Sequence, residues 1–168
     1  EKIALDNDNA FIALSNQGLS IVDISDKSMP VELANINDRQ SWVVDVVAAN
    51  GIGYFLKEES SEKKDSVVIM DAKQPSAPIA IIEGMITKKG KISLHNERLY
   101  LQSDTGKLAI YDISIPSIPV LISNDTFPMT ATAMIVSGDF LYTTQKSQLN
   151  IVDISNAENP ILVSSIDT

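Results

Sequence analysis

The 168-residue chain is 44% hydrophobic, 21% charged and 5% aromatic, and its net charge is −9. A domain of roughly 150 residues buries about 70% of the surface of its unfolded chain, so this length and apolar content predict a folded domain and exclude a disordered chain. The acidic excess would repel a phosphate backbone, which argues against nucleic acid as a partner. Spanning a bilayer takes an apolar run of about 18 residues, and the lack of such a run predicts no membrane insertion.

Cysteine is absent, and His95 is the only histidine. Disulfides, thiolate nucleophiles and thiolate zinc sites are therefore excluded, as is a metal centre built from several histidines of one chain. We expect no metal site, no cofactor and no catalytic residue, and we favour a function other than catalysis. The chain begins at Glu1 without a signal-like stretch, which we interpret as a mature or excised segment.

A repeat of about 41 residues is the main feature of the sequence. In chain order its third stretches read LSIVDIS, VVIMDAK, LAIYDIS and LNIVDIS, and the fifth place of each is an aspartate: Asp23, Asp71, Asp112 and Asp153. A proline stands seven residues after each aspartate: Pro30, Pro78, Pro119 and Pro160. Successive aspartates lie 48, 41 and 41 positions apart. Periods of this length indicate a solenoid, an array or a propeller.

Each repeat divides into four short apolar stretches, which in the last repeat are 133–136, 140–144, 149–154 and 161–166. The first two stretches of each repeat are separated by residues that favour hairpins: Asp6-Asn7-Asp8-Asn9, Asn50-Gly51, His95-Asn96-Glu97 and Ser137-Gly138-Asp139. The third stretch is apolar on both faces and needs cover on both, which neighbouring propeller blades supply. We therefore predict an all-β fold of β-propeller blades, four tandem four-stranded antiparallel sheets in a single domain over 1–168. The repeats fall at about 1–37, 38–84, 85–125 and 126–168.

Three segments carry other chemical possibilities. Residues 6–9 resemble the start of a calcium loop, but such a loop needs Gly at its sixth place and Glu at its twelfth, where Phe11 and Gln17 stand. A plain hairpin turn is favoured. The charged segment 57–65 coincides with the extra residues of the second repeat, which predicts a longer solvated hairpin loop or else a partner-binding loop. His95 has no nucleophile motif to serve, so we interpret it as a solvated turn residue.

The strand IVDIS, followed by a short polar turn and proline, resembles the LVIVD-repeat family. The resemblance covers nearly the whole chain, with full matches at Ile21 and Ile151, IYDIS at Ile110 and a departure, IMDAK, at Ile69. Family members tend to carry a tyrosine in the second strand, a position that we assign to Ile12, Tyr54, Tyr100 and Tyr142. The resemblance implies propeller blades in bacterial or archaeal proteins that are exported or lie at the cell surface. It implies no single activity.

The repeated aspartates and prolines are interpreted as structural. Four converging carboxylates could form a ligand ring for an ion. Alternatively, each carboxylate accepts N–H bonds from the backbone of its own turn, as in an Asx turn. We favour the turn, because a residue that recurs in every blade is needed by every blade. Proline would end the turn, since its φ is locked and it has no N–H to donate.

The connections between repeats, 37–42, 83–91 and 124–131, differ from one another. In propellers such connections lie around the mouth of the channel, where ligands commonly bind. Aromatic residues and Arg are enriched at interface hot spots, so the candidate ligand- or partner-binding residues are Arg39, Trp42, Lys88, Lys89, Phe127 and Met129. The alternative is that Trp42 and Phe127 pack under their own loops as part of the core.

Three classes of function remain open. We favour a non-enzymatic binding module of an exported protein (extracellular, at the cell surface or periplasmic) that contacts a protein or a glycan through its inter-blade connections. The second class is a propeller hydrolase or lyase with a metal bound in the channel, which the single histidine disfavours. The third is a structural spacer in a larger surface protein.

The number of repeats leaves the size of the ring open. Natural propellers have 4–8 blades, so four repeats either close a ring alone or form part of a larger one. The other blades of a larger ring would come from a second copy of the chain, in a homodimer, or from the remainder of a longer polypeptide. An open arrangement of four blades would leave two apolar blade faces bare. We favour the larger ring.

Overall fold

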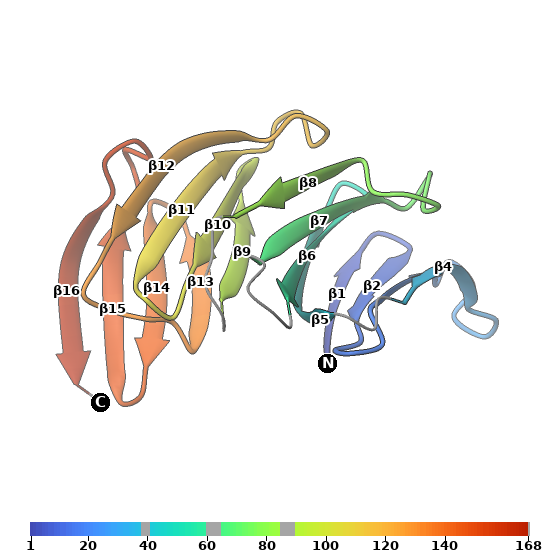
Figure 1. The fold of residues 1–168 in the computed structure, drawn as a ribbon, viewed down its shortest axis with the longest axis horizontal. Coiled ribbons are helices and arrows are strands. Elements are labelled where there is room, and N and C mark those ends of the chain that lie inside the picture. The colour runs from blue at the N-terminus through green and yellow to red at the C-terminus, as the bar shows by residue number, and fades with distance from the viewer. Residues whose placement is uncertain (38–40, 60–64, 85–89, 168) are drawn as a thin grey trace. The chain divides into compact units, whose positions relative to one another are not determined.

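The computed structural model describes residues 1–37, 41–59, 65–84 and 90–167. Over these residues the chain forms sixteen strands (Figure 1). Sheet 1 contains β1 (Lys2–Asp6), β2 (Asn9–Ala13), β3 (Leu19–Asp23) and β4 (Val31–Ile36). Sheet 2 contains β5 (Ser41–Ala49), β6 (Ile52–Glu59), β7 (Ser66–Asp71) and β8 (Ala80–Glu83). Sheet 3 contains β9 (Lys91–His95), β10 (Arg98–Gln102), β11 (Lys107–Asp112) and β12 (Val120–Thr126). Sheet 4 contains β13 (Ala133–Ser137), β14 (Phe140–Gln145), β15 (Gln148–Asp153) and β16 (Ile161–Asp167).

Each sheet is an antiparallel meander whose strands are hydrogen-bonded in sequence order. This confirms the predicted all-β architecture of four four-stranded repeats. The strands are rich in Ile, Val, Leu and Tyr, side chains that suit a pleated surface covered by its neighbours. No helix capable of crossing a membrane occurs in the described part of the chain.

The first two strands of every sheet form a hairpin, as predicted, and its turn has two residues. Strand pairing closes at Asp6 with Asn9 and at the three equivalent pairs of the other sheets. Left-handed backbone falls inside these turns, at Asn7, Asn50, Gly51, Asn96, Glu97 and Gly138. Such turns match the right-handed twist of the strands that they join, which is why Asn and Gly recur in them.

The chain divides into two compact units, residues 1–85 and 86–168, and each holds two sheets. In the first unit the buried core lies between sheets 1 and 2, and its members include Phe11, Leu19, Ile21, Phe55 and Met70. In the second unit the core lies between sheets 3 and 4, and its members include Tyr100, Leu108, Ile110, Leu141 and Val152. One face of a sheet therefore packs on the opposite face of the next sheet within each unit.

The strand register corrects one assignment. The third-strand isoleucine that stands two residues before each repeated aspartate pairs with Tyr54, Tyr100 and Tyr142 in sheets 2, 3 and 4. In sheet 1 the same isoleucine, Ile21, pairs with Phe11. Phe11 therefore occupies the tyrosine position, and Ile12 lies on the opposite face, because neighbouring residues of a strand point to opposite sides.

Two faces of each sheet can now be defined. The leading face carries the third-strand isoleucine and its aromatic partner, Phe11 or a tyrosine. The trailing face carries the alternate residues. Sheets 1 and 3 use their leading faces in the two cores, whereas sheets 2 and 4 contribute their trailing faces.

The charged insert of the second repeat differs in part from the prediction of a loop. β6 continues to Glu59, so residues 57–59 extend the strand, and β5 is correspondingly long, at nine residues. Residues 60–64 lie outside the described residues. Asp65, at the end of the segment, is buried, so this residue does not belong to a solvated loop.

Candidate functional site

One edge of every sheet is built around the repeated aspartate. The Oδ1 atom of Asp23, Asp71, Asp112 and Asp153 accepts a hydrogen bond from the backbone N–H two residues later, over 2.7, 2.8, 2.8 and 2.9 Å. The N–H of the intervening residue donates to a carbonyl of the first hairpin, as from Ile24 to Asp8 over 2.8 Å. The same bond recurs in the other three sheets, at Ala72, Ile113 and Ile154. The aspartate thus orders its own turn, and the residue after it ties that turn to the first hairpin of the same sheet.

The electrostatics of these carboxylates agree with a turn geometry. The backbone N–H and hydroxyl of Ser25 hold the pKa of Asp23 below its ordinary value of 3.8. Hydrogen bonds from Ser114 and Ser155 lower the pKa of Asp112 and Asp153 in the same way. The four prolines stand near the start of each fourth strand and directly precede it in sheets 1, 3 and 4. Within the described ranges, no three His, Cys, Asp or Glu side chains gather in a way that could hold a metal ion.

The two other polar turns also have plain structural positions. Residues 6–9 form the hairpin between β1 and β2, and the Asp6 carboxylate accepts a short hydrogen bond from the N–H of Gly51. This bond joins the first hairpins of sheets 1 and 2 in the first unit. His95 is the last residue of β9, where it pairs with Arg98 across the hairpin and is half-buried.

The predicted binding residues of the connections fall into three groups. Trp42 is the second residue of β5 rather than a loop residue, pairs with Glu58 and keeps 44% of its surface exposed. Met129 is a core residue, with 3% of its surface exposed, and Phe127 is half-buried against the same core. Both are therefore packing residues of the second unit. Arg39, Lys88 and Lys89 lie outside the described residues.

At two glycines the backbone of the following connection approaches so closely that no side chain would fit. The sequence analysis did not single these glycines out. Gly18, in the turn before β3, has φ +87°, and a Cβ there would lie 1.9 Å from the carbonyl oxygen of Ile36. Gly106, in the turn before β11, has φ +84°, and a Cβ there would lie 2.1 Å from the carbonyl oxygen of Phe127. The signal was available, because each glycine stands one or two residues before the repeated strand.

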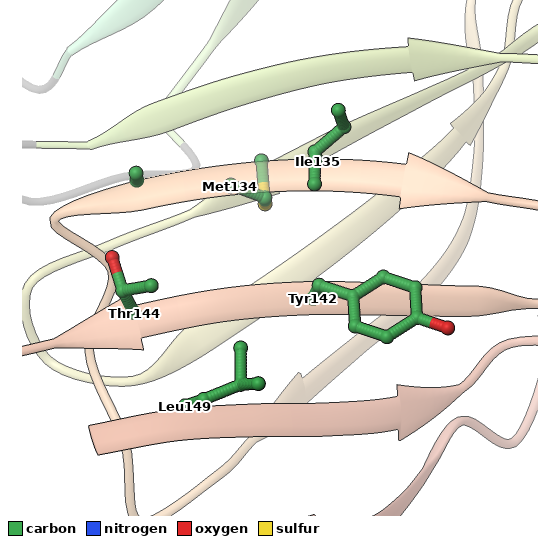
Figure 2. A pocket seen from close by; sticks show the side chains of 6 residues that line it. Met134, Ile135, Tyr142, Thr144 and Leu149 are labelled. Atoms are coloured by element: carbon green, nitrogen blue, oxygen red, sulfur yellow. The ribbon is translucent and has the colours of Figure 1, made fainter. Parts of the chain in front are cut away.

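The leading face of sheet 4 is exposed, unlike its counterparts. Phe11, Tyr54 and Tyr100 are buried, whereas Tyr142 is only half-buried and Ile135 beside it is 64% exposed. A hollow of about 170 Å³ opens on this face, and its walls are almost entirely apolar. It is lined by residues of β13, β14 and β15: Ala133, Met134, Ile135, Tyr142, Thr144 and Leu149. Figure 2 labels five of them, Met134, Ile135, Tyr142, Thr144 and Leu149.

Comparison with known families identifies the repeat. The pattern of the LVIVD repeat matches residues 1–38, 92–126 and 130–168. These segments correspond to sheets 1, 3 and 4, and the unmatched part contains sheet 2 with its divergent IMDAK strand. No curated protein matches the chain by sequence.

Solved structures with similar folds are larger than this chain. The AztD protein of Citrobacter koseri superposes with a TM-score of 0.69 at 13% identity, over 100% of this chain and 46% of that one. A chain of the mitotic checkpoint complex gives a TM-score of 0.74 at 15% identity, over 98% and 48%. A Lactobacillus plantarum protein gives 0.70 at 12% identity, over 96% and 55%. The chain therefore spans about half the length of the chains that it resembles.

Proposed function

The chain belongs to the LVIVD repeat family, and on that premise we propose that it is a binding module rather than an enzyme. Its partner is a protein or a glycan, and the contact is made beside the connection between sheets 1 and 2. The observation that carries the proposal is Trp42, a large aromatic side chain left 44% exposed at the start of β5. Burying such a side chain in a partner is a common source of binding energy.

The backbone around Trp42 is fixed while its side chain remains exposed, an arrangement that favours a role in binding a partner over a role in the core. Ser41 and Val43 on either side are buried, so the backbone at this point is held in place. Ser15 and Val43 exchange two backbone hydrogen bonds of 3.0 Å, which anchor the start of β5 to the turn of sheet 1. Because the backbone that carries the indole is already ordered, binding at Trp42 has little backbone ordering entropy to overcome.

The proposal extends to the setting of the protein. We propose that the module acts outside the cytoplasm, in an exported or surface protein, as the family resemblance implies. The acidic composition supports a partner other than nucleic acid.

The test uses the fact that Trp42 is the only tryptophan. Surface-protein extracts and glycan arrays are screened with the 168-residue chain, and each hit is titrated by tryptophan fluorescence. We expect a hit that shifts the emission and that Trp42→Ala weakens at least about tenfold, or about 1.4 kcal/mol. Trp42→Phe should retain part of the affinity. Ile118→Ala, which trims an exposed side chain in the turn between β11 and β12, should bind as the parent does. Blank screens would favour a spacer, and equal affinity of Trp42→Ala would remove Trp42 from the site.

A further inference from the structure

The leading face of sheet 4 has the composition of an internal packing surface. Its centre consists of Ile135, Tyr142 and Ile151, which pair across β13, β14 and β15. Leu149 and Ile166 extend it toward one edge. In sheet 3 the equivalent residues Tyr100 and Ile110 are buried in the core with sheet 4. The residue pattern of the buried leading face of sheet 3 therefore recurs in sheet 4, where no other sheet in the described part of the second unit covers that face.

The hollow marks the place where an apolar side chain of the next segment sits in sheets 1 and 3. Leu149 and Thr144, which line it, pair with each other as Leu108 and Gln102 do in sheet 3. There, Met129 of the following connection shares the buried cluster with Leu108, and its carbonyl accepts a 3.5 Å hydrogen bond from Gln102.

The first unit shows the same arrangement. Leu19 and Ala13 hold the equivalent position in sheet 1, and Val43 at the start of the next sheet lies in their cluster. In both units, therefore, the leading face receives an apolar residue from the chain that leads into the covering sheet or begins it: Met129 before β13 and Val43 in β5.

The complementary surface is present on the same chain. The trailing face of sheet 1 exposes Ile3 and Leu5, which lie opposite Ile12 and Ala10 in the register. Its acidic residue, Glu32, accepts hydrogen bonds from Ser20 Oγ over 2.9 Å and from Asn35 Nδ2 over 3.0 Å. Covering this face would therefore bury a carboxylate whose Oε1 atom already accepts two hydrogen bonds.

We propose that the leading face of sheet 4 binds the trailing face of sheet 1 of a second copy of this chain. The contact repeats the packing of sheet 3 on sheet 4 with an intermolecular partner. Two observations favour a second copy: the chain carries both faces, and it spans 46–55% of the propeller chains that it resembles. Two copies bring eight sheets together, which lies within the range of known propellers. Such a head-to-tail contact either closes at the dimer or continues into longer assemblies.

The test is the solution mass of the 168-residue chain by sedimentation velocity, from about 5 to about 200 μM, a range that detects contacts of micromolar affinity. We expect species of at least twice 18.2 kDa. Ile135→Glu and Ile166→Glu alter the leading face of sheet 4, and Leu5→Glu alters the trailing face of sheet 1. Each should shift the chain to monomer, because it places a charge in an apolar contact. Ile118→Glu, a charge added outside both faces, should associate as the parent does.

The variants distinguish this partner from others. Mixing Leu5→Glu with Ile135→Glu leaves one intact pair of faces, so the mixture should form a dimer that neither variant forms alone. If Ile135→Glu abolishes association and Leu5→Glu does not, sheet 4 pairs with itself and the proposal is wrong. A parent chain that stays monomeric over the whole range also overturns it. All variants alter exposed side chains, and their melting curves should stay close to that of the parent.

Discussion

The two units of the chain solve the same packing problem with different side chains. In the first unit Phe11 packs over Gly53, where a Cβ would lie 2.4 Å from Cδ1 of the Phe11 ring. In the second unit the position equivalent to Gly53 is Leu141, which shares a buried cluster with Tyr100. The second unit therefore carries the larger side chain at both facing positions, while the backbone pattern is the same. The repeat prescribes the positions but not the side chains, and each core packs with its own set.

Both units have a glycine against which the following connection packs closely, Gly18 in the first and Gly106 in the second. Substituting such a glycine should cause the largest loss of folding stability. Gly18→Ala combines a left-handed φ, which costs about 1–2 kcal/mol, with a Cβ 1.9 Å from a backbone oxygen that cannot move aside. Overpacking adds about 1–3 kcal/mol, so we expect a loss of about 2–5 kcal/mol in the free energy of unfolding. Urea denaturation measures it.

The matched control for this change is Gly51→Ala. Gly51 has φ +78°, but no atom lies within 4 Å of its added Cβ. It should therefore lose only the strain of about 1–2 kcal/mol. Equal losses for the two variants would show that the close approach of the connection does not matter.

The first unit has Gly53 where the second has Leu141, and enlarging Gly53 should cause a smaller loss of stability than Gly18→Ala. Gly53→Ala forces a methyl group against the buried Phe11 and Phe55 rings, and we expect it to cost about 1–3 kcal/mol through overpacking. Phe11→Leu should cost less in the Gly53→Ala background than in the parent, because the smaller side chain makes room. A double-mutant cycle by urea denaturation measures this coupling. Additive losses would mean that the two positions do not share volume.

The smallest effect concerns the aspartate turns that both units repeat. The pKa of Asp23, Asp112 and Asp153 is lowered in the folded chain by hydrogen bonds from serine. A carboxyl with a lowered folded pKa stabilises the fold above its unfolded value of 3.8, and this contribution is lost as the pH falls through the folded pKa values. The melting temperature should therefore be level near pH 5 and fall progressively below about pH 4.

Asp153→Ala should remove one such contribution and lower the melting temperature at pH 7 by about 2–4 °C. Asp153→Asn keeps an acceptor oxygen without the charge, so it should lose less at pH 7. It should also show a weaker dependence on acid than the parent. An unchanged melting curve for Asp153→Ala would contradict the structural role of the repeated aspartate.

Local chemistry made much of the fold predictable from the sequence. The four sheets, their hairpins at Asn50-Gly51 and Asn96-Glu97 and the repeat of aspartate and proline all depend on residues within a few positions of one another. Turn residues select left-handed backbone, and alternation selects strands, so these features can be recognised without knowledge of what lies across the core.

The candidate site was less predictable, because exposure depends on partners distant in the sequence. Met129 lies in the connection before sheet 4 and Trp42 lies at the start of sheet 2, yet Met129 fills a core and Trp42 keeps 44% of its surface exposed. Register decided that Phe11 and not Ile12 faces the core, since a shift of one residue reverses the face. Tyr100 and Tyr142 stand in the same repeat position, and only packing distinguishes them. Sheet 4 covers Tyr100 in the core of the second unit. No sheet in the described part of that unit covers the leading face of sheet 4, so Ile135 is exposed and Tyr142 is only half-buried.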